Sequence, residues 1–227
     1  MHTAFEAITP GRIHRWGTAT LIVARRTPGP TPPRSPLPFL TPDERHLYQA
    51  LAPRRQTEWA AGRLLAKHLI HHHLATPPTD VEILPRHDGS PHPLINGRPI
   101  PGLNLSISHT THHVAAALAP DPVGIDLCET TSAPTIRRVA DHILTPHERT
   151  HTIPDHPHTL TAAWALKEAA VKADRHSIHG TAPRHIHIHS LTPPTLSGPR
   201  HAMLWHTTTA LLALVTTPHT AHDDTTA

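Results

Sequence analysis

Residues 164–172 read Trp164-Ala165-Leu166-Lys167-Glu168-Ala169-Ala170-Val171-Lys172. The stretch contains neither Gly nor Pro, and its pattern predicts a helix from Leu160 to Asp174. Glu168 and Lys172 are four residues apart, so they share one face of that helix. Taken alone, they form an ordinary surface ion pair worth roughly 0.3 kcal/mol. Whether the pair is more than that depends on two stretches that precede it.

The two preceding stretches carry an acid and a Ser-His turn. Val123-Gly124-Ile125-Asp126-Leu127 is an apolar strand with an acid near its end, and Ser106-Ile107-Ser108-His109 closes an earlier strand. Alone, the acid is better explained as a turn former and the Ser-His pair as a satisfied turn. In combination, Asp126 and Glu168 are carboxylates from separate elements. Mg²⁺ takes one or two carboxylates and fills its remaining positions with phosphate oxygens and water. The sequence therefore predicts a divalent metal held against a pyrophosphate, with Lys172 and His109 balancing phosphate charge.

Length and composition restrict the class of protein. The chain has 227 residues, enough for one large domain or two small lobes with a sizeable core. Aromatic residues make up 3%, so the core must consist of Leu, Ile, Val and Ala. The net charge of +3 gives no argument for nucleic-acid binding. Protonation of His would add positive charge and favour an anionic partner.

The single cysteine, Cys128, excludes an internal disulfide and is consistent with a reducing cytoplasm. No apolar run approaches the roughly 20 residues that a membrane helix requires. Residues 1–10 lack the basic and then apolar pattern of a signal peptide. These features predict a soluble, cytoplasmic protein.

The chain is rich in His and Pro, with 26 and 27 residues respectively. One hypothesis is therefore a His-rich protein that binds transition metals. However, the His residues are scattered and lack the regular spacing of metal ligands. A compositional bias explains them more simply, and the Pro clusters indicate loops.

Periodicity and turn signals predict alternating strands and helices. Strands are expected at 19–24, 81–84, 103–108, 114–118, 123–127, 186–191, 202–206 and 210–216, and helices at 56–74, 136–143 and 160–174. Thr41-Pro42-Asp43-Glu44-Arg45 is echoed by Thr145-Pro146-His147-Glu148-Arg149 about one hundred residues later, each time ahead of a long helix. The echo predicts an N-terminal lobe at 1–119, a C-terminal lobe at 120–217 and a frayed tail at 218–227.

These motifs resemble those of a known family. Gly124-Ile125-Asp126-Leu127 together with Trp164-x-x-Lys167-Glu168-x-x-x-Lys172 is similar to the two defining motifs of the 4'-phosphopantetheinyl transferase superfamily, and Ser106-x-Ser108-His109 resembles a third. Chain length and paired lobes resemble its monomeric, surfactin-synthetase-activating branch. The resemblance implies an α+β fold with two similar lobes related by a pseudo-twofold, each a small antiparallel sheet with a long packed helix. It also implies a monomer.

The resemblance also implies an activity of the holo-acyl-carrier-protein synthase type. Coenzyme A would donate its phosphopantetheine arm to a Ser of an acyl or peptidyl carrier protein, releasing adenosine 3',5'-bisphosphate. The carrier would serve fatty-acid, polyketide or nonribosomal-peptide synthesis. Asp126 and Glu168 would ligate Mg²⁺, Glu168 or a water that it holds would take the Ser proton, and Lys172 would stabilise the bridging phosphate or protonate the leaving group. The residues implied to hold coenzyme A phosphates are Arg55, Arg63, Arg98, Ser108 and His109, together with Asp126 and Lys172.

The sequence departs from the family pattern at two places. Where the surfactin-type branch has a second acid, this chain has Cys128, and a thiol is a poor Mg²⁺ ligand. Either a water fills that metal position, the alternative we favour, or the strand ends early and Glu129 turns inward. The family's Gly-Lys-Pro element matches either Gly89-Ser90-Pro91 or Gly97-Arg98-Pro99. Arg98 keeps the charge and is the better physical candidate; plain turns explain both segments equally well.

The missing second acid also allows a catalytically lapsed descendant. Such a protein would bind coenzyme A or a carrier protein without transferring the arm. Both readings predict the same fold, and only an assay for transfer separates them.

Overall fold

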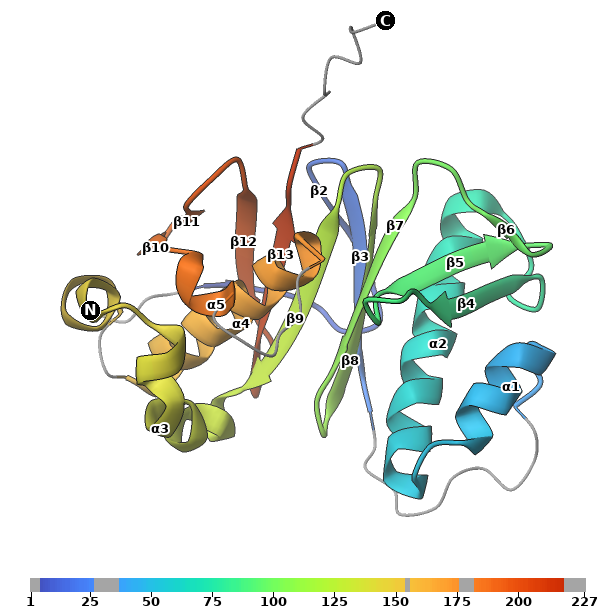
Figure 1. Cartoon of the computed structure of the whole chain (residues 1–227), viewed down its shortest axis with the longest axis horizontal. Helices are drawn as coiled ribbons and strands as arrows, with labels where there is room; N and C mark the ends of the chain where they lie inside the picture. Colours follow the sequence, from blue (N-terminus) through green and yellow to red (C-terminus); the bar gives the residue numbers. More distant parts are fainter. Residues whose placement is uncertain (1–4, 27–36, 154–155, 176–181, 219–227) are drawn as a thin grey trace, which may run out of the picture.

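The computed structural model describes residues 5–26, 37–153, 156–175 and 182–218, and the protein is an α+β fold (Figure 1). The first half of the chain contains β1 (Glu6–Ala7), β2 (Ile13–Trp16), β3 (Ala19–Arg25), α1 (Pro42–Gln49), α2 (Pro53–Leu74), β4 (Val81–Pro85), β5 (Pro91–Ile95), β6 (Arg98–Pro99), β7 (Asn104–His109) and β8 (His113–Ala119). The second half contains β9 (Val123–Glu129), α3 (Ala133–Ile143), α4 (Pro157–Ala173), α5 (Ala182–His185), β10 (Ile188–Leu191), β11 (Pro194–Leu196), β12 (His201–His206) and β13 (Ala210–Thr216), with a 3-10 turn at Thr130–Ser132 and a π-helical turn at Glu148–Thr152.

Two four-stranded sheets have related strand orders. The first runs β2-β3-β8-β7 and is antiparallel throughout. The second runs β1-β12-β13-β9 and is antiparallel except for the parallel pair of β1 and β12. Three strands of each sheet, β3-β8-β7 and β9-β13-β12, follow one another in the same chain order. In each set a long helix comes after the first strand in the chain: α2 follows β3, and α4 follows β9. The division into lobes at 119 and 120 stays a prediction, and β1 lies in the second sheet.

The two sheets pack face to face, and a long helix covers each outer face. Figure 1 shows α2 on the right and α4 on the left, with β9, β3 and β8 between them. One apolar cluster lies between the sheets, one under α2 and one under α4. Strand β8 is buried along its whole length and contains Ala115, Ala116 and Ala117. Because these side chains are small, α2 and the second sheet can both approach the strand closely.

The sequence echo corresponds to a repeated structural contact. In the first half, Glu44 sits in the first turn of α1, fully buried, and its Oε2 accepts from the N–H of Thr41 at 2.9 Å. The same oxygen accepts from Lys67 Nζ of α2 at 2.6 Å, and Oε1 accepts from the N–H of Ile83 in β4 at 3.0 Å. A single carboxylate therefore ties a helix start, a long helix and a short strand together.

The second half repeats this arrangement with Glu148. Its Oε2 accepts from the N–H of Thr145 at 2.7 Å, its Oε1 accepts from the N–H of Ile188 in β10 at 2.7 Å, and Lys167 Nζ of α4 lies 2.9 Å from Oε1. Lys167 Nζ also donates to the carbonyl oxygens of Pro183 and Ile186. The Thr-Pro-x-Glu-Arg repeat thus encodes a buried anchor for each long helix.

Most predicted elements are confirmed, with shifted ends. Helix α2 begins at Pro53, three residues before the predicted start, and β9 continues to Glu129. The short elements β1, β2, β5, β6 and β11 were not predicted, because strands of two to five residues carry little periodicity. In the described part of the chain, no helix is both long enough and apolar enough to cross a membrane.

Candidate functional site

The two sheets meet along β7 and β9. Here backbone N–H groups of β9 donate to serine side chains of β7 instead of to backbone carbonyl oxygens. The N–H of Ile125 donates to Ser106 Oγ at 3.0 Å, and the N–H of Leu127 donates to Ser108 Oγ at 3.1 Å. Both serines are buried. Ser-x-Ser spacing therefore matches the two-residue period of β9 and holds the two edges together.

Glycine at position 124 allows α4 to approach β9 closely. A Cβ at this position would lie 1.8 Å from the carbonyl oxygen of Ala169 and 2.7 Å from the nitrogen of Ala173. Gly124, Asp126 and Cys128 alternate along one face of β9, the face toward α4. The close approach places Glu168 and Lys172 against Asp126.

We expect Gly124→Ala to destabilise the protein by about 2–3 kcal/mol, because α4 backbone atoms would have to move. The matched control is Gly62→Ala in α2, where the added Cβ would lie 3.0 Å from a single side-chain atom, Cγ2 of Ile107. Chemical denaturation of both variants measures the difference. Equal stabilities for the two variants would contradict the tight approach of α4 to β9.

Three ionisable side chains converge where α4 crosses β9. Lys172 Nζ donates to Asp126 Oδ1 at 2.7 Å and to the carbonyl oxygen of Ile125 at 3.1 Å. Ser108 Oγ donates to the same Oδ1 at 2.9 Å. Asp126 and Glu168 are each only 7% exposed. Among the described residues, no hydrogen bond reaches Asp126 Oδ2 or the Glu168 carboxylate, so these oxygens are available to a ligand.

The pKa of Glu168 is raised to about 7. Burial is the main cause, and the negative charge of Asp126 adds to it, while Lys172 acts in the opposite direction. Two buried carboxylates with one lysine therefore leave excess negative charge near neutral pH. A site of this kind favours an added cation or a proton.

The donor set fits a hard divalent cation such as Mg²⁺. Asp126 and Glu168 supply carboxylate oxygens without competing donors, which is the chemistry that Mg²⁺ prefers. Cys128 beside them is buried, and burial together with the charge of Asp126 raises the pKa of its thiol to about 12, so it stays protonated. Glu129 lies at the end of β9 and accepts from the N–H of His112 at 3.0 Å, so the strand does not end early. Within the described residues, no group of three or more His, Cys, Asp or Glu is arranged as a metal site.

His109 lies beside a second charged cluster at the end of β7. Its Nδ1 is 4.0 Å from Glu58 Oε2, and Glu58 also pairs with Arg26 and Arg54 at 3.7 Å each. Burial lowers the pKa of His109; Glu58 opposes this, and the charges of Arg55, Lys172 and Arg26 add to the lowering. The structure therefore brings the predicted residues His109, Arg55 and Lys172 into one electrostatic environment.

Two other predicted phosphate contacts lie elsewhere. The guanidinium of Arg63 lies 4.4 Å from the centre of the Trp59 ring, and its Nε donates to the carbonyl oxygen of Ile83 at 3.2 Å. Burial lowers the pKa of Arg63 to about 10. Arg98 is exposed on β6. Both assignments stay predictions, and neither side chain is brought to Asp126 by a contact in the described residues.

A cleft of about 300 Å³ lies between the β4–β5 turn and the end of α4. Gly89, Ser90 and Pro91 line it together with Lys172, whereas Arg98 does not. Of the two candidate Gly-x-Pro segments, the uncharged one is therefore at the cleft. The sequence analysis preferred Arg98 because of its charge alone. The turn between β4 and β5 instead places Gly89-Ser90-Pro91 at the cleft.

Sequence reasoning missed Glu58, Arg26, Arg86 and Arg175. Glu58 carried a usable signal, because it lies four residues before Gly62 on the apolar face of the predicted helix. An acid on such a face needs a buried partner. The other three gave no signal, since their positions depend on how the chain folds around the cleft.

Comparison with known proteins identifies one family. Residues 122–222 match a family model described as the 4'-phosphopantetheinyl transferase superfamily. The matched range includes Asp126, Glu168 and Lys172, and it leaves out Ser108 and His109. No curated protein matches the chain. Residues 122–222 are therefore similar to that superfamily, and the surfactin-activating branch stays a prediction.

Proposed function

We propose that the protein transfers the 4'-phosphopantetheine arm of coenzyme A to a Ser hydroxyl of an acyl or peptidyl carrier protein. The second product would be adenosine 3',5'-bisphosphate. The superfamily match over residues 122–222 supports this class of transferase. The observation that carries the proposal is the cluster of the buried carboxylates Asp126 and Glu168 with the half-buried Lys172, which lies where the two sheets meet.

Asp126 and Glu168 would hold one Mg²⁺, through the oxygens that no hydrogen bond occupies. When bound, this ion neutralises charge on the diphosphate of coenzyme A. A water would complete the position beside Cys128, because a protonated thiol is a poor ligand for a hard cation. Ser108 would act by fixing Asp126, since its hydroxyl donates to Oδ1 and accepts from the strand β9 backbone.

Glu168 would act as the base. It, or a water that it holds, takes the proton of the carrier Ser hydroxyl as the Ser oxygen forms a bond to the β-phosphorus. The bond from that phosphorus to the bridging oxygen breaks, and the nucleotide leaves as adenosine 3',5'-bisphosphate. Lys172 stabilises the charge on the leaving phosphate or gives it a proton.

His109 and Arg55 would contact phosphate groups of coenzyme A. They lie at the end of β7 and the start of α2, next to the buried Glu58. Glu58 lies beside His109, but its carboxylate is 4.0 Å from His109 Nδ1, which is too far for a hydrogen bond. His109 can therefore still bind a phosphate oxygen. Arg63 and Arg98 are kept as further candidates for phosphate contact.

The direct test is the mass of a carrier protein after incubation. Apo acyl or peptidyl carrier proteins should gain the mass of the phosphopantetheine arm only when coenzyme A, Mg²⁺ and the protein are all present. Intact-protein mass spectrometry measures the gain. No gain across several carrier proteins would exclude the proposal.

Mg²⁺ should raise the melting temperature, and the increase should depend on pH. Because the folded pKa of Glu168 is raised, the ion-free protein loses stability as pH rises from about 4.5 to about 7, where Glu168 ionises beside Asp126. Mg²⁺ should offset that loss at pH 8 and have little effect at pH 5.5, where protons compete for Glu168. Differential scanning fluorimetry at both pH values measures this. If Mg²⁺ raised the melting temperature equally at both pH values, Glu168 would not be a ligand of the ion.

A coenzyme A-binding module without transfer is the second candidate. The observation that favours it is Cys128, whose thiol stays protonated where the surfactin-type branch has an acid. The same mass assay, run with a binding measurement, distinguishes the two. Binding of coenzyme A without any gain in carrier mass would select the module.

A further inference from the structure

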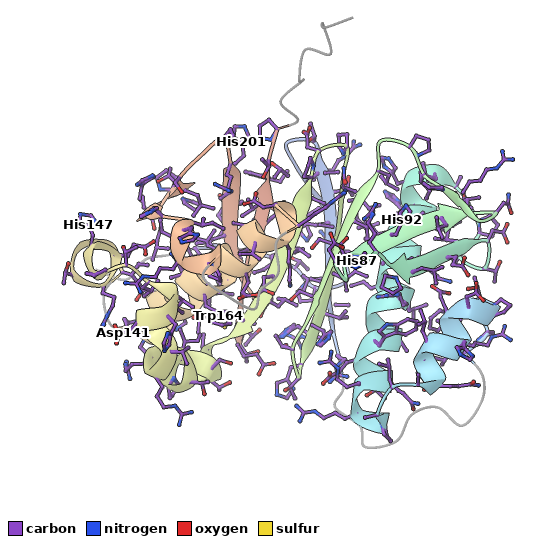
Figure 2. The ribbon with its side chains drawn as sticks, in the orientation of Figure 1. His87, His92, Asp141, His147, Trp164 and His201 are labelled. Atoms are coloured by element: carbon purple, nitrogen blue, oxygen red, sulfur yellow. The ribbon has the colours of Figure 1, made fainter. Side chains whose placement is uncertain are left out.

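His109 differs from the surface histidines of this chain, because it faces a buried carboxylate. His87, His147 and His201, which Figure 2 labels, are exposed. The side chain of His109 is only 31% exposed, and its Nδ1 lies 4.0 Å from Glu58 Oε2. Glu58 lies in α2 and is itself 7% exposed. The end of β7 and the buried face of α2 therefore bring one imidazole and one carboxylate together.

The Glu58 carboxylate is surrounded by cations at distances longer than a hydrogen bond. Its Oε1 lies 3.7 Å from Arg26 Nη2 and 3.7 Å from Arg54 Nε, and its Oε2 faces His109. In the part of the chain that the structure describes, no hydrogen bond reaches this carboxylate. A buried carboxylate stabilises positive charge beside it. Glu58 therefore influences which protons His109 carries.

The position of Glu58 restricts the nitrogen from which His109 can donate. A neutral imidazole has a proton on only one of its two nitrogens. With a carboxylate opposite Nδ1, the neutral form with its proton on Nδ1 is preferred, because a lone pair there would face a negative charge. The Nε2 lone pair then repels the oxygen atoms of a phosphate. His109 can donate from Nε2 to a phosphate only after it has gained a second proton.

In the free protein, His109 does not hold this second proton at slightly alkaline pH. Burial lowers the pKa of His109 below its usual range, and the charges of Arg55, Lys172 and Arg26 add to the lowering, while Glu58 opposes it. The charged groups around the pair come from α2, α4 and the segment after β3, and they are Glu58, Arg54, Arg55, Lys172 and Arg26. A phosphate that binds at Nε2 would add a second negative charge beside the ring.

We propose that Glu58 is a positioning residue, which makes His109 bind coenzyme A as an imidazolium and so couples ligand binding to the uptake of a proton. The inference rests on the proposed function, because it takes His109 as a phosphate contact. In the complex, Nδ1 donates to Glu58, Nε2 donates to a phosphate oxygen, and the added proton comes from the solvent. The gap of 4.0 Å has to shorten by about 1 Å for the first of these bonds. The affinity for coenzyme A should therefore fall as pH rises from the pKa of free His109 to its higher pKa in the complex.

Isothermal titration calorimetry in metal-free buffer with a chelator measures the proton uptake. Coenzyme A is titrated at about pH 7.5 in two buffers of different ionisation enthalpy, and the difference in heat gives the number of protons bound. The variant is Glu58→Gln, and the matched control is Glu6→Gln, the same change at an exposed position on β1. The glutamine amide can donate to Nδ1, so a neutral His109 can then donate from Nε2. We expect Glu58→Gln to take up at least about half a proton fewer than the unchanged protein, and the control to match the unchanged protein.

His109→Gln tests whether Glu58 acts through His109. This variant should lose the same proton uptake as Glu58→Gln, and the double variant should lose no more than either single variant. Because His109 is partly exposed, this test does not depend on the folding of Glu58→Gln. Proton uptake by His109→Gln equal to that of the unchanged protein would overturn the inference.

Two further outcomes would also overturn it and leave the proposed function standing. One is equal proton uptake by Glu58→Gln and the unchanged protein. The other is a further loss in the double variant, because Glu58 would then act through a different group. If the unchanged protein did not bind coenzyme A, the proposed function and the inference would fall together.

Discussion

Replacing Glu168 with glutamine is expected to reduce transfer to a carrier protein by roughly 10²- to 10⁴-fold, the range for loss of a general base. Glutamine has the same shape, so α4 should stay in place. However, it cannot take a proton and is a weaker ligand for a hard cation. The turnover number in the mass assay, measured at saturating coenzyme A and Mg²⁺, gives the effect.

Thermal stability separates this effect from unfolding. Glu168 is buried next to Asp126, and their repulsion raises its pKa, so the variant should melt at the same temperature or higher. Glu6→Gln is the matched control, since Glu6 is exposed on β1 and the chemical change is identical. Activity of Glu168→Gln within tenfold of the unchanged protein would remove Glu168 from the mechanism.

Replacing Lys167 with methionine should have the opposite profile, a large loss of stability. Lys167 is 1% exposed and donates to Glu148 and to two carbonyl oxygens. Its removal leaves the Glu148 carboxylate buried without a counter-charge, which costs about 3–5 kcal/mol. For a chain of this length, that corresponds to a melting temperature lower by roughly 10 °C or more. Scanning calorimetry measures the decrease.

The double variant Lys167→Met with Glu148→Gln tests the cause. Glutamine can still accept from the N–H groups of Thr145 and Ile188, and it carries no charge. The double variant should therefore be more stable than Lys167→Met alone. A decrease equal to the sum of two independent losses would contradict coupling between the two side chains.

The dependence of the free energy of unfolding on pH, measured at acid pH, tests the same pair, Glu148 and Lys167. Burial alone would raise the pKa of Glu148, but hydrogen bonds from Ile188 and Thr145 and from Lys167 lower it below its usual range. A carboxyl with a lowered folded pKa contributes stability above its unfolded pKa and loses it as pH falls through the folded one. The protein should therefore lose stability below about pH 4.5, and Glu148→Gln should show a smaller loss over that range.

Lys167 and Glu168 are neighbours in the sequence, but their environments differ. Successive residues of a helix point about 100° apart, so Lys167 meets the Glu148 anchor and Glu168 meets β9. The motif was predictable as a unit from its spacing. The separation into a structural lysine and a site glutamate was not, because it depends on what packs against each face of α4.

Patterns in the sequence predicted most of the longer elements, their order and the candidate acids Asp126 and Glu168. Alternation indicated β7, an apolar run indicated β9, and the Thr-Pro-x-Glu-Arg echo indicated two related helix starts. The combined motifs indicated Asp126, Glu168 and Lys172. Each of these features is a short motif or a short period, which a sequence displays directly.

Folding alone decided the contacts between distant segments. It buried Ser106 and Ser108 against the backbone of β9, placed the turn Gly89-Ser90-Pro91 rather than Arg98 at the cleft, and brought Arg86 and Arg175 to the same cleft. Such contacts depend on how closely helices and sheets pack and on the conformation of single residues, such as the positive φ of Arg175. No periodicity encodes them, because the partners lie tens of residues apart and meet only when both halves of the chain have packed around a common core.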